Sequence, residues 1–170
     1  LGEVNQGAAR ISEIVKALKT YIYLDQDPTQ QVDIHEGIEN TLIILRHKLK
    51  QGIEVRREYH PDLQPIQANG SELNQVWTNL IDNAVGAMGG KGTLTVRTYK
   101  ENDCVAVEIV DTGPGVPHEI KNRIFEPFFT TKPVGEGTGL GLDISFRIVV
   151  KKHRGDIRVE SEPGNTRFIV

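Results

Sequence analysis

The stretch SELNQVWTNLIDNAVGAMGGKGTLTVRTYKENDCVAVEIVD (71–111) contains a helix pattern followed by two strand patterns. Ser71 and Asn74 favour the start of a helix, apolar residues then recur at helical spacing, and a Gly-Gly pair favours its end. The segments TLTVRTYK (93–100) and VAVEIVD (105–111) alternate as strands do, and the ENDC between them predicts a hairpin. The stretch therefore predicts one helix followed by an antiparallel strand pair.

Further helix and strand patterns lie on both sides of this stretch. HEGIENTLIILRHKLKQG (35–52) predicts a helix with four apolar residues on one face, at Ile38, Leu42, Leu45 and Leu49, and another helix is expected from about 139 to 153. Further strand patterns are QVDI (31–34), IEVRREY (53–59), PIQA (65–68), GDIRVESE (155–162) and NTRFIV (165–170). Because strands and helices do not alternate regularly, we predict an α+β fold. The expected architecture is a two-layer α/β sandwich, with one mixed or antiparallel sheet covered by helices on one face.

The N-terminal segment has a different pattern. Its apolar residues recur at steps of four and three, at Val4, Ala8, Ile11, Val15, Leu18 and Ile22. Such a narrow stripe predicts a helix that pairs with another helix, for instance in a homodimer through residues 4–22, although packing on its own domain is an alternative. The proline-containing break DQDPTQQ follows, so we expect a helix and linker at 1–27 and a globular domain at 28–170.

Composition excludes several classes of protein. The 170 residues carry a formal net charge of −3 and no basic run, which argues against a nucleic-acid surface. No stretch approaches the roughly 20 apolar residues of a membrane span, so no membrane contact is expected of this part of the chain. The single cysteine, Cys104, lies in the apolar run CVAVEIV and is expected to be a small buried side chain. A cytoplasmic domain is the resulting expectation.

A glycine-rich stretch, EPFFTTKPVGEGTGLGLDI (126–144), precedes the last predicted helix. Glycines lose more backbone entropy on ordering than other residues, so their clustering indicates backbone that must move or must approach a ligand closely. Phosphate is a candidate ligand, because the free amides at a helix N-terminus bind anions. An ordinary surface loop is the alternative.

Two further sets of polar residues are candidates for ligand binding. Asn79 and Asn83 lie four residues apart and therefore share a helix face, where asparagine is unfavourable unless its amide has a partner such as a metal or a polar ligand. Asp111 ends a strand and precedes the loop TGPG, where backbone can approach a ligand. Solvent-facing asparagines and an aspartate that merely caps a turn are the alternatives.

Five motifs in a fixed order resemble those of the catalytic and ATP-binding domain of sensor histidine kinases, which has the Bergerat fold. They are NQVWTNLIDNAVGAM (74–88), DTGPGVP (111–117), RIFEPFFTTK (123–132), GEGTGLGL (135–142) and PGNTRF (163–168). Five ordered motifs are far more specific than one glycine pattern. The resemblance covers about residues 31–170, and it makes the N-terminal segment similar to the second helix of that family's dimerisation hairpin.

The resemblance implies a role for each matching residue. Asn83 would coordinate Mg²⁺ between the nucleotide phosphates, and Asn79 would assist it in catalysis. Asp111 would accept a hydrogen bond from the adenine amino group of ATP, supported by Thr166. The remaining nucleotide-binding residues that the resemblance implies are Gly113, Gly115, Phe128, Lys132, Gly137, Thr138, Gly139, Leu140 and Gly141. Phe125 and Phe129 would join Phe128 in holding the near end of a lid.

Departures from the family pattern shape the expected activity. Hydrolytic relatives such as gyrase carry glutamate where this chain has Asn79, and an amide cannot act as a general base, so a water-using ATPase is the less favoured alternative. Position 86 commonly holds Lys or Asp in histidine kinases, and here it is Gly86. A non-catalytic nucleotide-binding or interaction module therefore stays open as a second alternative.

The chain also lacks the family's phosphoacceptor motif. His35 and His118 each precede a glutamate without the downstream proline, and both are expected at the surface. The remaining histidines show no zinc-ligand spacing with Cys104. We therefore expect a histidine kinase domain that transfers phosphate to a histidine hairpin elsewhere in its parent protein, with the receiver domain of a response regulator as a further partner.

Overall fold

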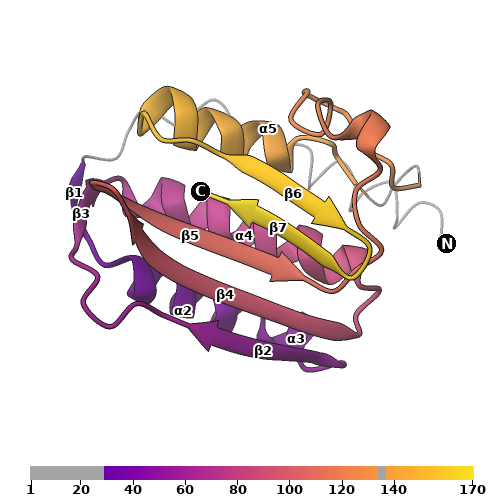
Figure 1. Ribbon diagram of the computed structural model, residues 1–170, viewed down its shortest axis with the longest axis horizontal. Helices are drawn as coiled ribbons and strands as arrows, with labels where there is room; N and C mark the ends of the chain where they lie inside the picture. The colour runs from indigo at the N-terminus through magenta and orange to yellow at the C-terminus, as the bar shows by residue number, and fades with distance from the viewer. Residues whose placement is uncertain (1–28, 134–136) are drawn as a thin grey trace, which may run out of the picture.

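The computed structural model describes residues 29–133 and 137–170. One layer is a five-stranded sheet with the order β2-β4-β5-β7-β6, and helices form a second layer on one of its faces (Figure 1). The sheet strands are β2 (Ile53–Glu58), β4 (Gly92–Glu101), β5 (Cys104–Asp111), β6 (Arg158–Glu162) and β7 (Asn165–Ile169). The helices are α2 (Ile34–Ile44), α3 (Arg46–Leu49), α4 (Gly70–Ala87), the 3₁₀ turn η1 (His118–Ile120), α5 (Gly141–Phe146) and its π-helical continuation η2 (Arg147–Lys152). The α+β sandwich is confirmed, whereas the predicted N-terminal helix, linker and pairing surface lie outside the described residues.

The sheet is mixed rather than purely antiparallel. β2 runs parallel to β4, and the pairs β4–β5, β5–β7 and β6–β7 are antiparallel. The two short strands β1 (Gln30–Val32) and β3 (Ile66–Ala68) form a separate ladder. The hairpin predicted from the alternation of residues 93–111 is therefore confirmed, and it places the end of β5 next to β7 in the middle of the sheet.

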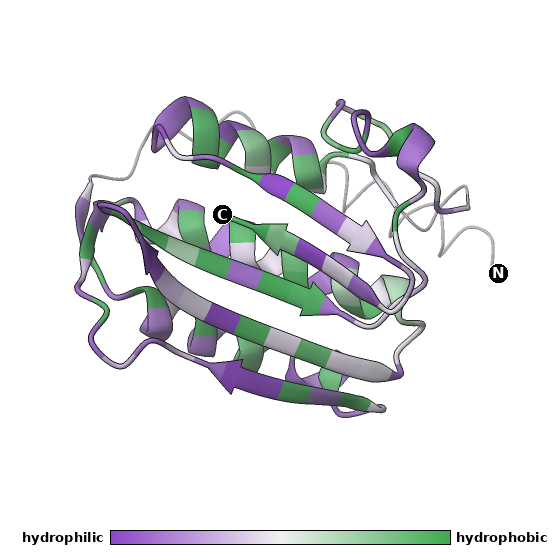
Figure 2. Cartoon of the chain, viewed as in Figure 1, coloured by the Kyte–Doolittle hydropathy of each residue, from purple (hydrophilic) through white to green (hydrophobic). Residues whose placement is uncertain are grey.

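The core lies between the sheet and the helices. Leu94 and Val96 of β4 are fully buried, and Trp77 of α4 is 2% exposed among them. The alternation of hydrophobic and hydrophilic residues along the strands is visible in Figure 2. The apolar face predicted for residues 35–52 is buried at all four positions, Ile38, Leu42, Leu45 and Leu49. The helical spacing therefore identified the packed face of this segment correctly.

The start of α4 differs from the prediction that Ser71 opens the helix. Asn69 is the N-cap, and its side-chain oxygen accepts a hydrogen bond from the backbone amide of Glu72 at 3.1 Å. Ser71 is an exposed residue of the first turn. Both residue types are good caps, and the preceding strand β3, which ends at Ala68, leaves Asn69 with the extended backbone that a cap requires.

Asn69→Ala should lower the free energy of unfolding by about 1 kcal/mol, because it removes the capping oxygen from a buried helix start. Ser71→Ala is the matched control and should change it by no more than about 0.5 kcal/mol. Urea unfolding of the three proteins measures both values. Equal losses in the two variants would contradict the assignment of Asn69 as the cap.

Three other expectations need correction. Cys104 is exposed, because it is the first residue of β5 and lies at the end of the hairpin rather than inside its apolar run. His35 is half-buried rather than at the surface: its ring stacks on Tyr59 and its Nε2 atom lies 2.8 Å from Thr98 Oγ1. The last helix begins at Gly141 rather than near Gly139.

In the described part of the chain, no helix has the length and apolar character that crossing a bilayer would require.

Candidate nucleotide-binding site

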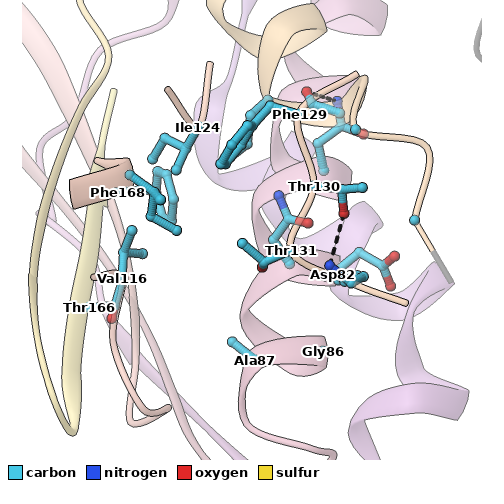
Figure 3. Close-up of a pocket in the computed structure, with 18 of the residues that line it drawn as sticks. Asp82, Gly86, Ala87, Val116, Ile124, Phe129, Thr130, Thr131, Thr166 and Phe168 are labelled. Carbon is cyan, nitrogen blue, oxygen red and sulfur yellow. Dashed lines mark hydrogen bonds between the residues drawn. The ribbon is translucent and has the colours of Figure 1, made fainter. Parts of the chain in front are cut away.

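A cavity of about 640 Å³ opens between α4, the loop that follows β5, the segment before α5, and β7. Figure 3 shows its lining, with Gly86 and Ala87 on α4 and Thr166 and Phe168 on β7. Phe129, Thr130 and Thr131 line it from the segment between η1 and α5. Ten of the predicted catalytic and nucleotide-binding residues line it: Asn79, Asn83, Asp111, Gly115, Lys132, Gly137, Thr138, Gly139, Gly141 and Thr166. Residues from five separate sequence motifs therefore meet at one cavity.

One face of α4 forms a wall of the cavity. Positions 75, 79, 82 and 86 follow helical steps of four, three and four, and all of them line the cavity, as does Asn83. The apolar residues Val76, Leu80 and Ile81 lie on the buried side of the same helix. The helix thus packs on the sheet through one face and presents polar side chains to the cavity through the other.

The two asparagines on this wall have different environments. Asn79 Nδ2 donates to the carbonyl of Gly141 at 2.9 Å and to Ser145 Oγ at 3.2 Å, while Asn79 Oδ1 accepts from Gln75 Nε2 at 2.9 Å. The side chain of Asn83 makes no hydrogen bond to any described residue, although it lines the cavity. Asn79 is therefore engaged in joining α4 to α5, and Asn83 has an amide oxygen available to a ligand.

Asp111 lies at the carboxyl end of β5 and is 2% exposed. Its Oδ1 atom accepts from the backbone amide of Gly113 at 2.8 Å, and within the described residues its Oδ2 atom has no hydrogen-bond partner. Burial raises the pKa of Asp111 above the ordinary value for aspartate, and the hydrogen bond from Gly113 opposes this shift. One carboxylate oxygen thus fixes the orientation of the group, and the other can accept a donor on a ligand.

Thr166 lies opposite Asp111 in the β5–β7 register. Its hydroxyl is hydrogen-bonded to Ser161 Oγ at 2.8 Å rather than to Asp111 directly. Gly113 does not line the cavity, but a Cβ atom there would lie 2.7 Å from Asp111 Oδ1 and 3.2 Å from the backbone of Ala87. Glycine at position 113 therefore permits the close packing of the loop on α4 that holds the Asp111 carboxylate in place.

The segment before α5 differs from the sequence-based interpretation at two positions. Phe128 does not line the cavity and its side chain is 68% exposed, whereas the neighbouring Phe129 does line it. Phe128 has a φ of 64°, and a Cβ atom on Gly139 would lie 2.4 Å from its carbonyl carbon. Leu140 is buried outside the cavity lining. Gly139 itself has a φ of 66°, which explains why α5 cannot begin there.

Sequence reasoning missed several residues of the lining. Gln75 and Asp82 lie on the same α4 face as the asparagines, so helical spacing could have identified them. Asp82 forms an ion pair with Lys48 at 2.5 Å. The other missed residues are mostly apolar or small and carry no distinctive sequence signal: Thr78, Ala87, Pro114, Val116, Pro117, Ile120, Ile124, Thr130, Thr131, Leu142, Ile144 and Phe168.

The cavity fits a hard cation only together with a ligand. The described residues contain no group of three or more His, Cys, Asp or Glu side chains that could hold a metal ion alone. Mg²⁺ commonly binds through one or two protein oxygens and completes its shell with phosphates and water. The unengaged amide of Asn83 suits that mode of binding.

Comparison with known proteins agrees with this geometry. Residues 68–170 match the family described as "Histidine kinase-, DNA gyrase B-, and HSP90-like ATPase". Over 159 residues, 91% of the chain, the sequence is 36% identical to the signal transduction histidine-protein kinase AtoS of Escherichia coli (strain K12). The chain spans 25% of the length of that relative.

Solved structures of histidine kinases share the fold. The catalytic domain of histidine kinase ThkA superposes with a TM-score of 0.76 at 32% identity, covering 84% of this chain and 93% of that one. Histidine kinase ThkA in complex with response regulator protein TrrA superposes with a TM-score of 0.79 at 26% identity, covering 95% of this chain and 47% of that one. The mixed sheet and its helix layer are thus those of a histidine kinase catalytic domain.

Proposed function

The chain belongs to the histidine kinase-, DNA gyrase B-, and HSP90-like ATPase family, and from this premise we propose that it binds ATP with Mg²⁺ and donates the terminal phosphoryl group to a histidine outside the described residues. The observation that carries the proposal is that Asp111, Asn83 and the start of α5 border the same cavity. The buried carboxylate matches an adenine base, the unengaged amide oxygen matches a metal ion, and the backbone amides at the start of α5 match a phosphate chain.

The base is bound at the end of the cavity where β5 ends. Asp111 Oδ2 accepts a hydrogen bond from the exocyclic amine of adenine, and Oδ1 stays bonded to the amide of Gly113. Gly115, with a φ of 92°, lets the loop backbone pass beside the base. Thr166 supports this end of the cavity from β7 through its bond to Ser161.

The phosphates are bound where α4 meets α5. Asn83 would hold Mg²⁺ through its amide oxygen, and the ion would supply charge neutralisation to the phosphate chain. The amides of Gly139, Leu140 and Gly141 lie at the start of α5, where the helix dipole favours an anion. These groups act by position and charge, which is the main protein contribution to phosphoryl transfer.

Asn79 serves as a positioning residue. Its amide holds the carbonyl of Gly141 and the hydroxyl of Ser145, so it fixes the first turn of α5 against α4. In the described lining, the carboxylates are Asp82, which is paired with Lys48, and Asp111 at the base end. Neither arrangement provides a general base beside the phosphates, which supports transfer over hydrolysis.

Asn79→Asp is expected to weaken ATP binding by about threefold to tenfold, the equivalent of roughly one net hydrogen bond. The carboxylate would replace the donor that holds the Gly141 carbonyl. Calorimetry with and without Mg²⁺ tests the role, because a positioning residue leaves the Mg²⁺-dependent gain in affinity unchanged. Loss of that gain in Asn79→Asp would show instead that Asn79 contacts the metal.

We further propose two macromolecular partners. One is a helical hairpin of the parent kinase that carries the phosphoacceptor histidine, and the other is the receiver domain of a response regulator. The second proposal is supported by the solved complex of histidine kinase ThkA with response regulator protein TrrA. The segment at residues 4–22 remains our candidate for pairing with a second helix, and its apolar stripe supports this.

The test of transfer uses the chain, γ-labelled ATP with Mg²⁺, and a supplied histidine hairpin from a related kinase. The expected product is an acid-labile and base-stable phosphohistidine on the hairpin, which is lost when its histidine is replaced by alanine. ATP binding without any labelled hairpin would favour a non-catalytic module. Repeated release of inorganic phosphate without the hairpin would favour a water-using ATPase.

A further inference from the structure

Ser161 lies on the edge strand β6 and outside the lining of the cavity, yet its side chain contacts two residues of that lining. The amide of Val116, in the loop after β5, donates to Ser161 Oγ at 2.7 Å. The hydroxyl oxygens of Ser161 and Thr166 lie 2.8 Å apart. One serine hydroxyl therefore joins two walls of the cavity, the loop after β5 and strand β7.

The hydrogen bonds of this hydroxyl serve the cavity walls rather than β6. A backbone N–H can only donate, so Ser161 Oγ accepts from Val116, and its own proton remains available to Thr166 Oγ1. Thr166 is 3% exposed. Alanine at position 161 would remove an acceptor from the Val116 amide and a partner from the buried Thr166 hydroxyl, so both losses would fall on residues of the lining.

Other contacts hold the same loop without the serine hydroxyl. The backbone carbonyl of Ser161 accepts from Lys121 Nζ at 2.8 Å. The amide of Gly164, in the turn between β6 and β7, donates to the carbonyl of Gly113 at 2.8 Å. Because both bonds use backbone atoms of the β6–β7 hairpin, they persist when the side chain at position 161 changes. Loss of the hydroxyl should therefore loosen the loop locally and leave it attached to the sheet.

We propose that Ser161 is a positioning residue for the base end of the nucleotide, because its hydroxyl holds the Val116 backbone and the Thr166 side chain at a fixed separation. Thr166 is the partner of Asp111 in the β5–β7 register, so the separation that Ser161 sets is also the width of the cavity beside the Asp111 carboxylate. The inference rests on the proposed function, since it concerns the end of the cavity where Asp111 would bind adenine.

The test measures Mg²⁺–ATP affinity by calorimetry for the wild-type chain, Ser161→Ala and Ser161→Thr. Ser161→Ala should bind about tenfold more weakly, because it removes both hydrogen bonds to the lining. Ser161→Thr restores a hydroxyl at a strand position that tolerates β-branched residues, so it should recover most of the affinity. The gain in affinity on adding Mg²⁺ should be the same in all three proteins, because the contacts of Ser161 lie at the base end.

Val159→Ala is the matched control for a general weakening of the edge strand. Val159 lies on the same face of β6, packs against the core and is outside the cavity lining. Val159→Ala should lower the free energy of unfolding in urea and bind ATP as the wild type does. Urea unfolding of the Ser161 variants checks that they are folded under the conditions of the titration.

A double variant tests whether Ser161 acts through Thr166. Thr166→Val replaces the hydroxyl by a methyl group of similar size and removes the same contact from the other side. Residues that act through one contact are not additive. Ser161→Ala/Thr166→Val should therefore lose less affinity than the product of the two single losses.

The outcomes separate this inference from the function on which it rests. Wild-type affinity in Ser161→Ala would overturn the positioning role while leaving nucleotide binding intact. A loss that Ser161→Thr does not recover, an equal loss in Val159→Ala, or a double variant whose loss is the full product would each overturn it as well. A wild-type chain that binds no nucleotide would overturn the proposed function first, and the role of Ser161 with it.

Discussion

Asp111→Asn is expected to weaken ATP binding by about a hundredfold, close to the upper range for a hydrogen bond to a charged group. The asparagine can still accept from the amide of Gly113, so the loop conformation should persist. Its second atom, however, becomes an NH₂ group that faces the amino group of adenine, and two donors then oppose each other. Calorimetry measures the loss, and Asp103→Asn in the exposed hairpin turn should have no effect.

A second nucleotide makes this prediction specific to the base. Inosine triphosphate carries a carbonyl where ATP carries the amino group, so the wild-type chain should discriminate against it. Asp111→Asn should remove or reverse this preference, because its NH₂ group can donate to the carbonyl. Equal discrimination in both proteins would show that Asp111 does not contact the base.

The titration of Asp111 predicts how ATP affinity should change with pH. Burial raises the pKa of Asp111, so its carboxylate protonates at a higher pH than an ordinary aspartate as the solution is acidified. ATP affinity should therefore be highest above that raised pKa, where Asp111 is ionised, and should decrease as the pH falls below it. The affinity of Asp111→Asn should not show this decrease. The free energy of unfolding should also depend on pH. Because the folded-state pKa of Asp111 is raised, its contribution to stability is present below the unfolded-state pKa and is lost as pH rises through the folded-state pKa.

Asn83→Ala is the second large effect, and it should appear only when Mg²⁺ is present. We expect about a tenfold to hundredfold loss of ATP affinity with Mg²⁺, the range seen when groups that support a metal site are removed, and little change in chelator. The amide of Asn83 has no hydrogen bond to the described residues, so its loss should not destabilise the fold. Asn122→Ala, at an exposed position outside the cavity lining, is the matched control.

Asn83→Ala and Asn79→Asp test opposite assignments of two residues on one helix face. Asn83→Ala should remove the Mg²⁺-dependent part of binding, and Asn79→Asp should preserve it. If the two variants behave in the reverse way, the metal ligand and the positioning residue must be exchanged. Equal Mg²⁺ dependence in both variants and the wild type would show that neither asparagine of α4 binds the metal.

Helix faces and strand alternation were the features that sequence predicted best. Regular elements repeat with fixed periods, so the burial of Ile38 and Leu42 and the pairing of β4 with β5 followed from spacing alone. The same spacing placed Asn79 and Asn83 on one face but could not separate their roles. That distinction depends on Gly141 and Ser145, which come from a helix more than fifty residues later and accept hydrogen bonds from Asn79.

Loop residues and element ends were predicted less well because no period applies to them. Phe128 and Phe129 are neighbours in sequence, yet one is exposed and the other lines the cavity. Cys104 belongs to an apolar run but lies where the strand begins, so Ala106 and Val107 further along the run are buried and Cys104 is not. Lys132 of the loop lies so close to α4 that a Cβ atom at position 86 would be 3.1 Å from its Nζ atom, and no local sequence pattern predicts this proximity.

The proposed function requires this cavity to bind ATP with Mg²⁺, and a calorimetric titration of the wild-type chain measures that binding. ATP would be titrated into the chain once with Mg²⁺ and once with chelator. We expect saturable binding of one nucleotide per chain, with higher affinity when Mg²⁺ is present. Absence of saturable binding under both conditions would contradict it and would leave only a shared fold with the histidine kinase catalytic domains.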